Sequence, residues 1–143
     1  MKKLFYAAAA ALIVGVASVR ADMFDRDYAL STSGTGTASR AYVVRGELRG
    51  VAIERTGETA ILGGTNMTVT VSSPFHTAFS YAWDGNTDTF KVPLCVADKA
   101  ADGSTTTNTY TSVPIAGLCT VSIAPPENVA VTNDFKVTLI YWR

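Results

Sequence analysis

Apolar and polar residues alternate with a period of two through most of the chain after residue 40. The pattern is clearest at residues 67–71 and 135–141, where large apolar residues occupy every second position. Side chains of a strand point alternately to its two faces, so this period places one face on a core and the other in solvent. Residues 41–143 are therefore predicted to form an all-β domain. We expect a single antiparallel β-sandwich of about seven short strands, for which a jelly-roll-like topology is one option.

One predicted strand changes face part-way along its length. In the charged stretch 45–55, Leu48 has one parity, and Val51 and Ile53 have the other. A strand that changes face needs a bulge or a bend, and glycine accommodates either because it has no Cβ. Gly50 lies between the two parities, so we expect a bulge there.

A hairpin is predicted after the strand 79–83, whose aromatic residues Phe79, Tyr81 and Trp83 are interpreted as core or interface, with a sugar-binding platform as the alternative. Asp84 and Gly85 form a dipeptide that favours a tight turn between paired strands. Residues 90–96 follow as the next strand. Pro93 has no N–H to donate to a ladder, so this strand is expected at a sheet edge or with a bulge.

The N-terminus has the pattern of a secretory signal peptide. Lys2 and Lys3 form a positive start, and residues 4–17 are uncharged and rich in alanine. Small residues precede a candidate cleavage point between Ala21 and Asp22. The apolar run is shorter than the roughly 20 residues of a membrane-spanning helix. The alternative is an apolar helix that is kept in the mature chain and packs on a partner.

The charges of the chain are balanced, with 12 basic and 12 acidic residues. Loss of residues 1–21 would remove Lys2, Lys3 and Arg20 and no acid, so the formal charge would fall from zero to −3. Nucleic-acid-binding domains carry clustered basic residues. We therefore expect no basic patch and no nucleic-acid partner.

Residues 22–40 are predicted to form a flexible N-terminal arm. Residues 23–30 could add a short strand, but residues 31–39 contain only Ser, Thr, Gly and Ala, which is typical of a linker. We expect this arm to pack poorly on its own domain. The polar stretch 97–112 is predicted to be a long surface loop, and both segments are expected at contacts with partners.

The sequence contains no convincing catalytic, cofactor or metal site. His76 is the single histidine and lies in a predicted turn, with no sign of a nucleophile that it could activate. Residues 84–88 match the start of a calcium loop, D-x-N-x-D. The positions that should then hold Gly and Glu hold Thr89 and Cys95, so the motif fails and a turn is preferred.

Cys95 and Cys119 are the only two cysteines. In a chain with an export signal, such a pair suggests one disulfide. Both residues fall in predicted strands, so they could equally be two buried thiols. A disulfide requires their Cα atoms to lie within about 7 Å of each other.

Five short motifs, in order over residues 42–143, resemble a family of small β-sandwich proteins encoded among the structural genes of tailed phages. Each motif is short, but their order and spacing agree with that family. They are R-G-E-L followed by V-x-I at 45–53, T-V-T-V at 68–71, F-x-x-P at 90–93, P-I-A-G-x-C-x-V-x-I at 114–123 and V-T-L-x-Y at 137–141.

The resemblance implies a capsid decoration or cement protein without enzymatic activity. Such a protein is present in many copies in the virion and contacts the major capsid protein or other virion proteins. It has no catalytic residues, no cofactor and no small-molecule substrate. The signal-like N-terminus instead favours a secreted or periplasmic β-sandwich, such as a binding module or a pilin-like surface subunit. A small hydrolase is the third hypothesis, with no nucleophile–base pair to support it.

Overall fold

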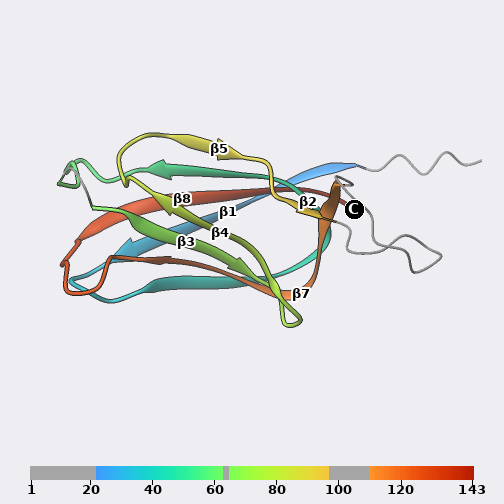
Figure 1. Cartoon of the computed structure of the whole chain (residues 1–143), viewed down its shortest axis with the longest axis horizontal. Coiled ribbons are helices and arrows are strands. Elements are labelled where there is room, and N and C mark those ends of the chain that lie inside the picture. Colours follow the sequence, from blue (N-terminus) through green and yellow to red (C-terminus); the bar gives the residue numbers. More distant parts are fainter. Residues whose placement is uncertain (1–21, 63–64, 97–109) are drawn as a thin grey trace, which may run out of the picture.

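The structure is a computed structural model that describes residues 22–62, 65–96 and 110–143 (Figure 1). Every regular element in this part of the chain is a β-strand, so the predicted all-β class is confirmed. The strands are β1 (Met23–Thr32), β2 (Ala38–Arg55), β3 (Met67–Ser72), β4 (Thr77–Trp83), β5 (Thr89–Lys91), β6 (Leu94–Val96), β7 (Tyr110–Ala124) and β8 (Asn133–Trp142).

The strands form one continuous antiparallel sheet in the order β1-β8-β2-β7-β3-β4. Two short strands lie off this path, because β5 pairs with β2 and β6 pairs with the start of β7. The sheet does not close, and β1 and β4 lie at its two edges. The antiparallel arrangement is as predicted, whereas two separate sheets of a sandwich are not confirmed.

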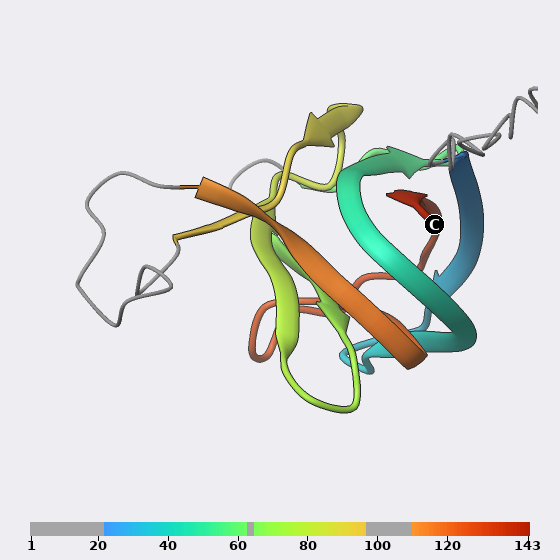
Figure 2. The same cartoon turned by 90° about the vertical axis from the view of Figure 1, so that its right-hand side faces the viewer.

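The long strand β2 belongs to both halves of this sheet. Its first part, from Ala38 to Leu48, pairs with β7, and its second part, from Glu47 to Arg55, pairs with β8. Figure 2 shows β2 curving between these two neighbours. Strands from the two halves of the sheet consequently pack against each other across one core. Trp83 of β4 packs edge-to-face on Phe135 of β8, with ring centroids 5.7 Å apart, and both are buried.

The predicted bulge in β2 is confirmed. Leu48 pairs with Tyr141 and Gly50 pairs with Ile140, so Arg49 is the extra residue on the β2 side. Leu48 is buried before the bulge, and Val51 is buried after it. The inserted residue is therefore what allows apolar residues of both parities to reach the core.

The prediction of a flexible arm at residues 22–40 is wrong. β1 pairs with β8 along its whole length, and Tyr28 and Leu30 are buried in the core. In the Gly/Ser/Thr-rich segment 31–39, only residues 33–37 lie outside the strands, and they form the turn between β1 and β2. That turn is held to the β7–β8 connection by a bond from the Val131 N–H to the Gly34 carbonyl at 2.8 Å. Apolar and polar residues alternate at positions 28–32, and this period indicates the strand that the prediction of a flexible arm missed.

The predicted hairpin after β4 is also wrong, although its turn is present. Residues 84–88 make a tight loop, but β4 pairs with β3, and β5 crosses to pair with β2. The Phe90 ring then covers Gly50, where a Cβ would lie 2.6 Å from the ring. This contact favours the long-range pairing of β5 with β2 over a local hairpin between β5 and β4. Pro93 separates β5 from β6, as its missing N–H requires.

Two predicted segments fall outside the described residues. They are the signal-like residues 1–21, with the cleavage point at Ala21, and most of the loop 97–112. Within the described part of the chain, no helix is long and apolar enough to cross a membrane.

Candidate functional site

The β3–β4 turn brings Ser73 and His76 together, a pair that the sequence did not indicate. Ser73 Oγ lies 3.1 Å from His76 Nδ1 and also accepts the N–H groups of Phe75 and His76, at 3.4 and 3.3 Å. Because the Ser73 hydroxyl accepts two backbone N–H groups of its own turn, its role is to stabilise that turn. No carboxylate bonds to His76 among the described residues, so the third member of a triad is missing there.

The Asp84 loop is held by its own hydrogen bonds. Asp84 Oδ1 accepts the N–H groups of Asn86 and Thr87 at 3.0 and 2.9 Å, and Oδ2 accepts the Thr87 hydroxyl at 2.7 Å. The Thr87 side-chain bond, followed by these backbone bonds, lowers the pKa of Asp84 below its ordinary value. The described residues contain no group of acids, histidines and cysteines placed to hold a metal. The hydrogen bonds of Asp84 to Asn86 and Thr87 make this loop the turn that the sequence favoured.

Of the two alternatives for Cys95 and Cys119, the structure excludes the disulfide. Cys119 is a free, fully buried thiol. The β6–β7 register places Cys95 opposite Thr111, eight residues along β7 from Cys119. At about 3.3 Å per residue, that offset is well beyond the reach of a disulfide. Burial raises the pKa of the Cys119 thiol, as expected for an ordinary core residue.

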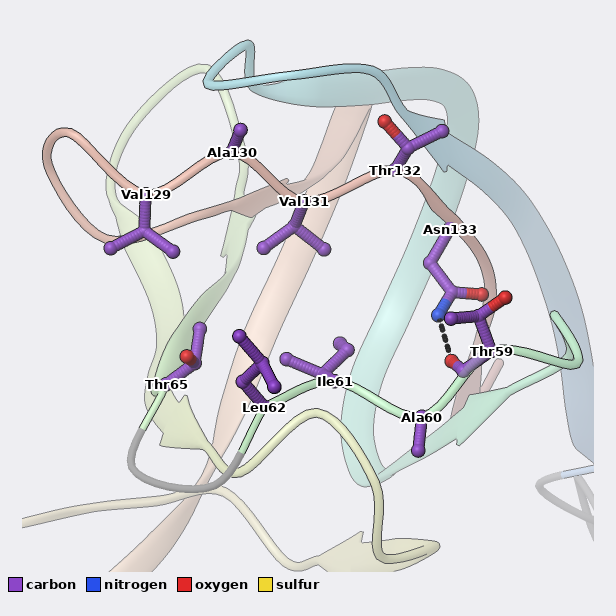
Figure 3. A pocket seen from close by; sticks show the side chains of 10 residues that line it. All are labelled: Thr59, Ala60, Ile61, Leu62, Thr65, Val129, Ala130, Val131, Thr132 and Asn133. Atoms are coloured by element: carbon purple, nitrogen blue, oxygen red, sulfur yellow. Dashed lines mark hydrogen bonds between the residues drawn. The ribbon is translucent and has the colours of Figure 1, made fainter.

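A small pocket lies where the segment before β3 meets the β7–β8 connection (Figure 3). Its volume is about 150 Å³, and its wall is mostly apolar, with Ile61 and Leu62 facing Val129 and Val131. Asn133 Nδ2 donates to the Thr59 carbonyl and ties the two segments together. The described residues that line it offer mainly apolar contact.

The outward face of β2 and β7 carries an apolar surface, the outer-face patch. Val43 and Leu118 are directly paired across the two strands and are 65% and 55% exposed. Ala41 and Ala116 are exposed on the adjacent rungs of the same ladder. An antiparallel sheet with one solvated face normally places polar residues outward. The outward face of the neighbouring β3 follows that rule with threonine and serine. The patch is therefore a local departure from the rule.

The second unusual surface is the arginine pocket, about 290 Å³ in volume. Three arginines from separate strands or strand ends reach it, beside Tyr141, Val43 and Val44: Arg26, Arg45 and Arg143. The expectation of no basic patch is thus wrong. A net charge gives only the balance of charges, and here the fold gathers three residues that are far apart in sequence. No local sequence signal could have found this site.

Comparison with known protein families finds no family model that matches the chain, and comparison with curated proteins finds no match. The resemblance to phage decoration proteins therefore stays a prediction from short motifs.

Proposed function

We propose that this chain is a non-enzymatic structural protein that decorates or cements a phage capsid through contacts with the major capsid protein or other virion proteins. The observation that carries the proposal is the outer-face patch. Val43 and Leu118 lie side by side and exposed on a sheet face that would otherwise be polar. Contiguous exposed apolar surface of this kind marks protein–protein contact sites.

Other large apolar side chains are exposed at separate places on the molecule. Phe90 on β5, Phe75 in the β3–β4 turn and Leu62 before β3 are 56%, 81% and 83% exposed. A protein that sits in a shell contacts several neighbours, and each specific contact buries on the order of 1,000 Å² or more. Exposed apolar residues on several sides suit such a position, in which many copies share repeated contacts.

The second candidate is a secreted or periplasmic β-sandwich module. It is favoured by the signal-like residues 1–21, because assembly of a virion takes place in the cytoplasm, where an exported chain would be absent. The two functions therefore differ in where the protein is found and in its first residue.

Mass spectrometry of particles purified from the source separates the two. The decoration function predicts the chain in particles, in fixed ratio to the major shell protein, with residues near Met1 intact. Absence from particles, together with a mature protein that begins at Asp22 in the periplasm or medium, would contradict it.

Binding to particles made without this chain tests the patch itself. We expect Leu118→Lys and Ala116→Lys to fold normally, because both side chains face outward, and to lower particle occupancy by about tenfold or more. Thr68→Lys is the matched control, since Thr68 is exposed on the outward face of β3. Equal binding by all variants and the original chain would exclude the outer-face patch as the contact.

A further inference from the structure

The arginine pocket is assembled from backbone that the sheet holds in place. Met23 pairs with Trp142, so the start of β1 and the end of β8 lie side by side (Figure 1). The Arg143 N–H extends this ladder with a bond to the Asp22 carbonyl at 3.2 Å. Arg45 lies in the β2–β7 ladder opposite Ala116. Arg26 and Arg45 thus project from paired strands, and Arg143 follows β8 directly and is tied to Asp22 by its own N–H, so the site is largely preformed.

Among the described residues, no acidic side chain lines the arginine pocket itself, and the nearby Glu47, which shares an adjoining hollow with Arg45 and Arg143, is paired with Arg49. Among the described residues, ion pairs join Arg49 to Glu47 and Lys136 to Glu54, and neither pair includes a pocket arginine. Three guanidinium groups that share one pocket repel each other, and an anion between them would turn that repulsion into attraction.

Arg26 lines the pocket and is held in place by an aromatic neighbour. Its Cζ lies 5.0 Å from the centre of the Tyr42 ring, which in turn packs edge-to-face on buried Tyr28. A guanidinium group above an aromatic ring can still donate its N–H groups to a further partner. These N–H groups match the oxygens of carboxylate or phosphate groups with two parallel hydrogen bonds.

We propose that the arginine pocket binds a terminal phosphate group, either as inorganic phosphate or at the end of a small molecule. Three fixed positive charges match a dianion with three terminal oxygens better than a monoanion. The internal phosphodiester of a nucleic acid carries one charge and has two bridging oxygens, so it would use the pocket less completely.

Isothermal titration of the full chain with inorganic phosphate tests the site, with ionic strength held constant by chloride so that screening does not change. We expect saturable one-site binding. Arg26→Gln and Arg143→Gln should each weaken it about tenfold or more, because each removes a charged hydrogen bond. Arg40→Gln is the matched control: Arg40 is exposed on β2, does not line the pocket, and loses the same charge. Equal unfolding midpoints of the variants without phosphate establish that they fold.

Dimethyl phosphate, a phosphodiester monoanion, distinguishes the two forms of phosphate and should bind at least about tenfold more weakly than inorganic phosphate. Three results would overturn the proposal. They are no saturable binding by the original chain, equal weakening by Arg40→Gln and the pocket variants, or dimethyl phosphate binding as tightly as inorganic phosphate.

Discussion

Removal of the Tyr28 hydroxyl should stabilise the protein. Tyr28 is fully buried, and its Oη has no hydrogen-bond partner in the described part of the chain. Burial, the largest cause, raises the pKa of Tyr28 far above its ordinary value, so the buried group is a neutral hydroxyl. An unpaired buried hydroxyl costs about 1–3 kcal/mol of desolvation free energy. Tyr28→Phe keeps the ring that packs on Tyr42 at 5.0 Å and removes this cost.

The free energy of unfolding of Tyr28→Phe should therefore exceed that of the original chain by about 1 kcal/mol or more. Urea unfolding followed by tryptophan fluorescence measures this as a higher midpoint at an unchanged slope. Tyr42→Phe is the control, because the Tyr42 hydroxyl is not among the unpaired buried atoms, and its effect should stay within about 0.5 kcal/mol. A loss of stability of about 1 kcal/mol in Tyr28→Phe would refute the reasoning, since it would mean that the hydroxyl has a partner, such as an internal water.

Three further predictions concern single residues. Gly46→Ala should lower the free energy of unfolding by about 2–4 kcal/mol in urea, because φ is +147° and the new Cβ would lie 1.8 Å from the Trp142 carbonyl oxygen; a loss below about 0.5 kcal/mol would contradict this. Asp84→Asn should be less stable than the original chain at neutral pH. The stabilisation from the lowered carboxyl pKa is complete above the ordinary value of 3.8, so the difference in urea midpoint should shrink below that pH and vanish as the pH falls through the lowered pKa of Asp84; a constant difference down to acid pH would exclude the carboxylate charge as its source. Cys119 should resist a thiol-specific reagent in the native protein and react after urea unfolding, as peptide mass spectrometry would measure, and rapid native labelling would contradict its burial.

The sequence predicted those parts of the fold that depend on local alternation. The antiparallel class and the bulge at Gly50 follow from the side-chain period and from the backbone freedom of glycine, whereas the single strand predicted at residues 90–96 is split at Pro93 into β5 and β6. The errors concern which strand pairs with which. Asp84 and Gly85 form a local turn, but β5 pairs with β2 and not with β4. This pairing is stabilised by the Phe90 ring, which covers Gly50.

The candidate sites were harder to predict than the fold. The arginine pocket joins Arg26, Arg45 and Arg143, whose proximity follows only from the pairing of β1 with β8 and from the course of β2. The outer-face patch has a weak signal in the sequence, because Val43 and Leu118 occupy the outward parity of their strands. Without the β2–β7 register, neither residue indicates that the other is its neighbour.

The pairing of the first strand with the last has a consequence for synthesis on the ribosome. β1 has no partner until β8 exists, and the first part of β2 has none until β7 exists. Most of the chain must therefore leave the ribosome before either strand can form its ladder, and closing such long loops makes folding slow. During that time the nascent chain exposes unpaired apolar strands that other copies could capture. Chaperone binding to nascent β1 and β2 would shorten that exposure. A change in chaperone supply should therefore alter the yield of folded protein in the cell and leave the stability of the folded protein almost unchanged.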